Sequence, residues 1–249
     1  LCIEIGYRFG RATNQHAESE QESSVSALVG SVLGLTAFVL AFTFGIVYER
    51  YDDKKNLVRD EANAIWTAYQ RADFLPEAAR IEAKKDMRRY LDLHLSIPFA
   101  KEQSQQATMK KVLAVLSETK EIQAKLWSNG IKQVRNSPDL NSDIGALYLE
   151  ALNDMTNIQE LRVAAGIETR VHSSIWLTLY TLTFGGMLAL GYQTGITGSH
   201  RSKASPILAC SFGILLTLIA ALDRPGVILV TQQPLIDIHA SMTSKASSL

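Results

Sequence analysis

The chain has 249 residues, 25 basic and 25 acidic side chains, no formal net charge and 47% hydrophobic residues. Balanced charge without a dense basic patch argues against a nucleic-acid partner. The two cysteines, Cys2 and Cys210, both lie in apolar segments, and they offer neither a disulfide framework nor a metal site. The average composition is that of a soluble protein, but the apolar residues are gathered into blocks, and these blocks predict the fold.

The N-terminal residues combine an apolar stretch with basic side chains. We expect residues 1–11 to be the end of a first transmembrane helix whose start precedes this sequence, with Arg8 and Arg11 at the membrane interface. A polar loop rich in Glu, Gln and Ser is expected at 12–23.

The longest predicted helix begins in an uncharged stretch. No charge occurs from Ser23 to Tyr48, which is long enough for a membrane span with some tilt. No Pro or Gly then interrupts the pattern before Pro76. We therefore expect one helix that crosses the membrane over 24–48 and continues in water to 72.

One face of this span has a distinctive order of side chains. Small residues four positions apart come first, and such spacing lets helix backbones approach closely in lipid. The helix-packing candidates are Ser26, Gly30 and Gly34. Bulky apolar residues continue the same face, and the pore or neck candidates are Gly34, Phe38, Phe42 and Ile46. This face has two possible explanations. It packs against other helices, or it forms apolar rings that close a pore by expelling water.

Residues 49–170 are predicted to form a soluble helical bundle inserted between membrane spans. In its first helix Glu61, Asn63 and Trp66 are expected on a solvated face with the Trp ring buried, while Ile65 and Ala68 face inward. Helical periodicity and Pro punctuation then predict helices at 77–97, about 103–134 and about 140–165. Candidates for a structural polar group are Arg50, Glu61, Asn63, Asp223 and Arg224.

Two further uncharged runs predict a third span at 173–196 and a fourth at 204–222. The tail, 223–249, is expected to hold a short extended piece and a helix that lies back on the bundle, with disorder after Ser241. Four spans place both chain ends and the bundle on one side of the membrane. Lys and Arg residues flank the spans on both sides, so the positive-inside rule does not decide which side of the membrane this is.

Catalytic and metal-binding patterns are missing from the sequence. The five histidines are scattered, and there is no Gly-rich phosphate loop, nucleophile elbow or thiol motif. We therefore expect no enzyme, no cofactor and no metal.

The run F-V-L-A-F-T-F-G-I-V-Y-E-R-Y resembles the second span of bestrophin anion channels, with Phe38, Phe42 and Arg50 at the same relative spacing. The whole chain resembles the bacterial bestrophin-like family of uncharacterised membrane proteins. The motifs that carry this likeness are A-F-T-F-G, R-Y, E-A-N-A-I, T-A-Y-Q-R-A-D-F-L-P, R-R-Y-L-D-L and L-D-R-P…Q-Q-P-L-I-D-I.

The resemblance implies an all-α homopentamer of four-span subunits in the bacterial inner membrane, with a cytoplasmic helical body and a central anion pore. Phe38 and Phe42 would match the apolar neck of bestrophins. Gly34 departs from the pattern, because bestrophins place a third bulky neck residue there. No acidic run follows Pro225-Gly226, so a calcium clasp is not expected.

Two functions follow from these observations. The first is an oligomeric, passive anion channel with its neck on the second span. The alternative is a structural or accessory membrane subunit that binds a protein partner, such as another membrane subunit, through its helical bundle. Both readings place the chain in a lipid membrane.

Overall fold

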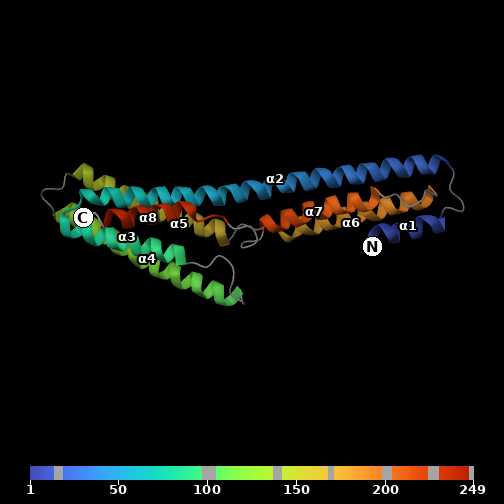
Figure 1. The fold of residues 1–249 in the computed structure, drawn as a ribbon. Helices are drawn as coiled ribbons and strands as arrows, with labels where there is room; N and C mark the ends of the chain where they lie inside the picture. The colour runs from blue at the N-terminus through green and yellow to red at the C-terminus, as the bar shows by residue number, and fades with distance from the viewer. Residues whose placement is uncertain are drawn as a thin grey trace. The chain divides into compact units, whose positions relative to one another are not determined.

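A computed structural model describes residues 1–13, 19–96, 105–136, 142–167, 171–197, 204–223 and 230–246. All regular elements in these ranges are helical, so the all-α expectation is confirmed there (Figure 1). The helices are α1 (Cys2–Thr13), α2 (Ser19–Arg71), a short 3₁₀ helix (Ala72–Phe74), α3 (Glu77–Ser96), α4 (Gln105–Asn136), α5 (Ser142–Ile167), α6 (Ser173–Ile196), α7 (Ala204–Asp223) and α8 (Gln233–Ala246).

The chain divides into two compact units. The first, here called the apolar unit, comprises Leu1–Tyr51 and Arg170–Ile228. The second, here called the bundle unit, comprises Asp52–Thr169 and Leu229–Leu249. Helix α2 contributes residues to both units because it continues without a break from the uncharged stretch into an amphipathic one.

The end of α2 follows from local chemistry. Leu75 precedes Pro76 and adopts an extended backbone with ψ of 152°, as steric contact with a following proline ring requires. The carbonyl of Pro76 then accepts the amide of Arg80 at 2.9 Å, at the start of α3. Pro76 lacks an amide hydrogen, so it fits a helix start and not a helix interior.

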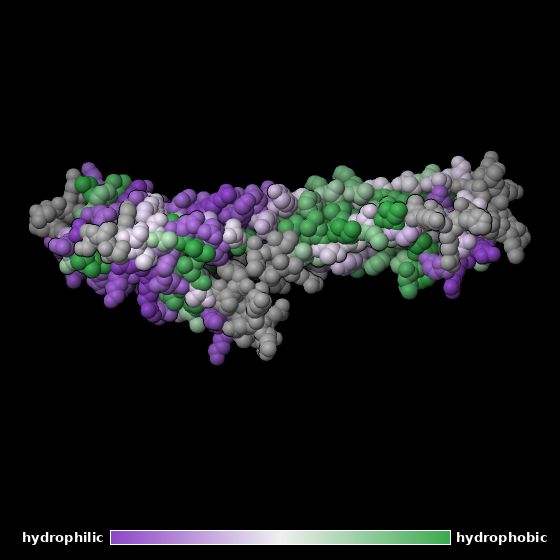
Figure 2. Space-filling model, in the orientation of Figure 1, coloured by the Kyte–Doolittle hydropathy of each residue, from purple (hydrophilic) through white to green (hydrophobic). Residues whose placement is uncertain are grey.

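Three helices of the described residues are long and apolar enough to cross a membrane: Ser23–Phe74, Ser173–Ile196 and Ser205–Asp223. The apolar unit buries Leu40 and Val47 of α2 against Leu179 of α6 and Ile219 of α7. Green and pale surfaces are frequent over the apolar unit in Figure 2, whereas purple is frequent over the bundle unit. The structure thus shows three candidate spans where the sequence predicted four.

Helix α1 packs against α6 through glycines of both helices. A Cβ atom on Gly6 would lie 2.1 Å from the carbonyl oxygen of Leu188, and one on Gly191 would lie 2.1 Å from that of Ile3. Gly10 and Gly195 are as tight, at 2.2 Å and 2.4 Å from the nearest backbone oxygen. Real Cβ atoms do not come this close to backbone oxygens. Only glycine therefore permits the two backbones to approach this closely.

The bundle unit has a core to which every one of its helices contributes. Ile65 and Ala68 of α2 are buried there as predicted, together with Met87 of α3 and Leu126 of α4. Helices α3, α4 and α5 begin and end within about three residues of the predicted bounds, since Pro and polar punctuation mark their ends. Their expected existence is confirmed.

Two expectations about connections were wrong. The polar loop is shorter than 12–23, because α1 continues to Thr13 and α2 begins at Ser19. The tail stays helical to Ala246 instead of becoming disordered after Ser241. The reason lies in packing: Leu235 and Met242 of α8 are fully buried in the bundle core. The expectation that a tail helix lies on the bundle is thereby confirmed.

We predict that Gly191→Ala lowers the thermal unfolding midpoint of the detergent-purified protein, because the added methyl group meets the backbone of Ile3. Overpacking of this kind costs about 1–3 kcal/mol, or roughly 2–10 °C in a chain of this size. Gly185→Ala is the matched control in the same helix, since nothing lies within 4 Å of its Cβ position. Equal midpoints for the two variants would contradict the role of the glycine contact.

Candidate functional site

The apolar part of α2 has two different faces. Residues of one face are buried within the apolar unit, and they are Val29, Thr36, Leu40, Thr43 and Val47. Phe38 and Phe42 lie on the opposite face and are 67% and 65% exposed. Their rings stack with centroids 6.3 Å apart. In a single chain, therefore, the two predicted neck side chains form an uncovered aromatic pair.

The small residues of this outward face have no neighbours within the described chain. Nothing lies within 4 Å of a Cβ position on Gly30 or on Gly34. Ile46 is half-buried, at the edge of the face and not at its centre. We call Gly30, Gly34, Phe38 and Phe42 the outward stripe of α2. The stripe offers an exposed aromatic pair and two glycines with open space at their Cβ positions, where another helix backbone could approach.

Ser26 differs from the two glycines predicted to share its role. Its hydroxyl oxygen accepts a hydrogen bond from Nε2 of Gln193 on α6 at 3.0 Å. Of the three packing candidates, Ser26 alone contacts another helix in the part of the chain that the structure describes. Packing through Gly30 and Gly34 stays a prediction about contacts with other chains.

Asp223 ends α7 and binds the start of α6. Its Oδ1 accepts the backbone amide of Val171 at 2.8 Å, and its Oδ2 accepts the indole N–H of Trp176 at 3.4 Å. Arg224, predicted beside it, lies outside the described residues. The half-buried Arg50 has a buried Nη1 that makes no hydrogen bond within the described ranges.

Glu61 lies 13 positions beyond Tyr48, in the bundle part of α2, and it is fully buried. Its Oε2 accepts a hydrogen bond from Nη1 of Arg162 on α5. Its Oε1 lies 3.0 Å from Nδ1 of His94 on α3. One carboxylate thus joins three helices.

His94 continues this network towards α4. Its Nε2 lies 3.4 Å from the side-chain nitrogen of Gln159 on α5, and the same nitrogen donates to Oγ1 of Thr119 at 3.1 Å. The side-chain nitrogen of Gln123 donates to Oε1 of Gln159. The ring of Tyr90 stacks on the His94 ring with centroids 4.4 Å apart. We call these five residues, together with Glu61 and Arg162, the bundle network.

The contacts of the bundle network shift the pKa values of two of its members, Glu61 and Tyr90. Burial alone would raise the pKa of Glu61, but the contacts with His94 and Arg162 outweigh burial and lower its pKa below 4.5. The carboxylate therefore stabilises the fold above pH 4.5, and that contribution is lost as the pH falls through the lowered pKa. Burial and the Glu61 charge raise the pKa of the Tyr90 hydroxyl well above 10.0, so it stays neutral.

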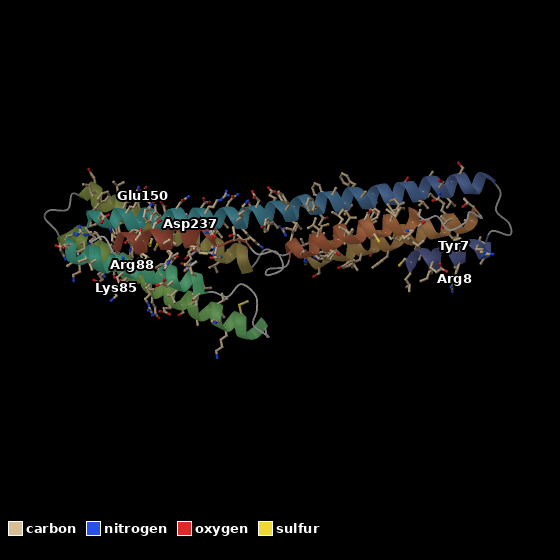
Figure 3. The ribbon with its side chains drawn as sticks, in the orientation of Figure 1. Tyr7, Arg8, Lys85, Arg88, Glu150 and Asp237 are labelled. Atoms are coloured by element: carbon tan, nitrogen blue, oxygen red, sulfur yellow. The ribbon has the colours of Figure 1, made fainter. Side chains whose placement is uncertain are left out.

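Charged contacts outside the network are more exposed. Arg88, labelled in Figure 3, donates to the Tyr69 hydroxyl at 3.3 Å. Lys125 of α4 lies 2.8 Å from Asp86 and 2.9 Å from Glu82, both on α3. Hydrogen bonds to Asp86 and then Glu82 raise the pKa of this lysine. Over the described ranges, no three His, Cys, Asp or Glu side chains gather as a metal ion would need.

Sequence reasoning placed Glu61 on a solvated face, and this was wrong. Asn63 is exposed and Trp66 half-buried, but Glu61 is buried. A signal was present: Glu61 precedes Ile65 by four positions and Ala68 by seven, so it shares their inward face. His94 likewise follows Tyr90 by four positions. Because Glu61 and His94 are polar, the sequence analysis did not assign them to the inward face that their helical spacing indicates.

We predict that Glu61→Gln destabilises the fold by about 3–5 kcal/mol at neutral pH, because Arg162, whose side chain is only 15% exposed, is left without a counter-charge. Chemical unfolding followed by tryptophan fluorescence measures this loss. Glu150→Gln is the control: Glu150 (Figure 3) pairs with Arg71 at 3.3 Å but is 62% exposed, and its loss should cost under about 0.5 kcal/mol. Similar losses in both variants would show that burial of the Glu61 pair has no special importance.

Comparison with known proteins identifies the family of this chain. A family model described as the bestrophin-like domain matches residues 4–235. No curated protein matches the chain significantly. The family resemblance stated from the sequence is confirmed by the domain match.

Two crystal structures share the fold. One is of a membrane protein with a point mutation; it is 15% identical, with a TM-score of 0.69, and the match covers 98% of this chain and 92% of that one. The other is of a bacterial bestrophin homologue from Klebsiella pneumoniae, also a point mutant; it is 14% identical, with a TM-score of 0.68, over 97% and 92% of the two chains. With its candidate spans, the chain is an integral membrane protein.

Proposed function

Because the chain belongs to the bestrophin-like family, we propose that it forms a homo-oligomeric channel through which anions pass passively along a neck lined by α2. The observation that carries this proposal is the outward stripe of α2. Its two stacked phenylalanines are about two-thirds exposed on a helix that has the length and hydropathy of a membrane span. The bestrophin resemblance supplies the expectation of anions and of five copies.

Cyclic symmetry would arrange the outward stripes of all copies around one axis. Copies of one helix around an axis present the same residues to each other, so Phe38 and Phe42 would form two stacked apolar rings. A narrow apolar ring expels water and thereby blocks ions until it widens. Gly30 and Gly34 would leave the pore wider on the side of the rings towards the N-terminus, because they carry no side chain.

Arg50 supports selection of anions. It is the first basic residue after the uncharged stretch that ends at Tyr48. Its buried Nη1 has no hydrogen-bond partner within the described part of the chain. A positive group beyond an apolar constriction raises the local concentration of anions.

The proposed topology has four spans. Helix α1 is 12 residues long, about 18 Å, which is shorter than a bilayer core of about 30 Å. Its glycine contacts with α6 nevertheless favour a place beside α6 in the membrane. The bestrophin resemblance adds the expectation that the bundle unit lies in the cytoplasm, below a bacterial inner membrane.

We predict a closed ring of copies, with five-fold symmetry, when the full-length protein is purified in mild detergent. Native mass spectrometry gives the copy number, and class averages from electron microscopy give the symmetry. A monomer, or a single copy bound to other polypeptides, would contradict the channel and favour an accessory membrane subunit that docks through its bundle.

We predict that Phe38→Ala combined with Phe42→Ala increases halide flux severalfold in liposomes, because the apolar constriction widens and rewets. A halide-quenched dye inside the liposomes measures the flux. Ile207→Ala combined with Ile214→Ala is the matched control: both side chains are exposed on α7, at 67% and 69%, and removing them should leave the flux unchanged. If the phenylalanine variant conducts like the wild type, these rings pack and do not gate.

A further inference from the structure

A small cavity lies in the bundle unit where α3 begins and α4 ends, and its volume is about 90 Å³. Leu75 and Leu126, which are 5% and 1% exposed, form part of its wall. An engineered apolar cavity of about 150 Å³ is large enough to hold benzene. The cavity in the bundle therefore has room for a molecule of about four to six non-hydrogen atoms, one end of which reaches the rim.

Small residues on two helices leave this space open. Ala79 and Ala83 of α3 line the cavity together with Gly130 of α4. A Cβ atom on Gly130 would lie 3.2 Å from Cε1 of Tyr148 and 2.9 Å from Cδ2 of Leu149, both on α5. Glycine at this position therefore lets the Tyr148 ring lie against the backbone of α4, where it forms part of the cavity wall.

Tyr148 brings a polar group to this wall. The residue is 1% exposed, and no hydrogen bond from its hydroxyl is found within the described ranges. Burial, and then the charge of Asp86, raise the pKa of this hydroxyl, so it stays protonated and can donate. A buried polar group without a partner costs free energy, and an acceptor atom placed in the cavity would remove that cost.

The rim of the cavity carries charges of both signs. Glu82 of α3 has a side chain that is 51% exposed, and Lys132 of α4 is also exposed. Lys125 lies 2.9 Å from Glu82 and 2.8 Å from Asp86, so one ammonium group serves two carboxylates and one negative charge is left over. Lys132 has no ion pair in the part of the chain that the structure describes. The α3 side thus has a surplus negative charge and the α4 side a surplus positive charge.

We propose that this cavity binds a small zwitterionic amino acid of about the size of alanine. The carboxylate of the ligand binds Lys132 and accepts the Tyr148 hydroxyl, its ammonium group binds Glu82, and its short side chain contacts the apolar wall. A simple anion would leave the charge of Glu82 unmatched, and a simple cation would leave that of Lys132 unmatched. The site belongs to the bundle unit, and it does not depend on whether the chain conducts ions.

The test is saturation-transfer NMR of the full chain in detergent, with L-alanine as the probe. The wild type should transfer saturation to the alanine methyl group at ~10 mM, a concentration at which even a weak ligand of this size is detected. Acetate and ethylammonium each lack one charged contact, so they should bind at least about tenfold more weakly. Absence of transfer to alanine, or acetate binding as tightly as alanine, would overturn the proposal.

Variants locate the binding. Lys132→Met and Tyr148→Phe should each weaken alanine binding about tenfold, because each removes one hydrogen bond to the carboxylate. Ala79→Leu should abolish binding by filling the cavity. Lys120→Met is the matched control, since Lys120 is exposed on α4 and does not line the cavity. Because Lys132 is exposed, its replacement should leave the fold intact. Alanine binding that is equal in Lys132→Met and Lys120→Met, or that survives Ala79→Leu, would overturn the proposal.

Discussion

The bundle unit depends on the pairing of one buried carboxylate. Burying an ionised carboxyl group without partners costs far more than a folded domain can spare. Glu61 is buried on α2, so α5 must bring Arg162 and α3 must bring His94 to it. A shift of either helix by one residue would separate these charges. The pair therefore selects one register of the helices among the many that apolar packing alone would tolerate.

The apolar unit is held together in a different way. In lipid there is little hydrophobic gain when helices meet, so close fit and satisfied polar groups matter more. Thr36 and Thr43 are buried, and their hydroxyls donate to the carbonyls four residues earlier, at 2.7 Å and 2.8 Å. Helix α2 thus meets two sets of requirements along one continuous backbone: apolar fit before Tyr48 and charge pairing after it.

Much of the fold was predictable because it depends on local rules. The uncharged run from Ser23, the proline at position 76 and the period of 3.6 residues define where helices begin and end. Helical period was less reliable for exposure: Ile81 and Met109 are apolar residues within the helices predicted at 77–97 and about 103–134, but they are 59% and 47% exposed. A stripe shows which side of a helix is apolar, and the neighbouring helices decide how much of it is covered.

The polar site could not be predicted to the same degree. Glu61 and Arg162 are 101 positions apart, and no local pattern pairs them. The outward stripe of α2 was found because its order of small and bulky residues is local. Gly6 and Gly10 have the same spacing as Gly30 and Gly34, yet only the first pair meets another helix in the described chain. Which pair of small residues is used depends on the partner helix, which spacing alone does not identify.

The glycine contact between α1 and α6 also constrains how the protein is made. Gly6 and Gly191 are 185 positions apart, so α1 leaves the ribosome long before its partner exists. At about 5–20 residues per second, the interval is roughly 10–40 s. During this interval the glycine face of α1 has no contact with α6. The contact between α1 and α6 therefore forms late in synthesis, after most of the chain has been made.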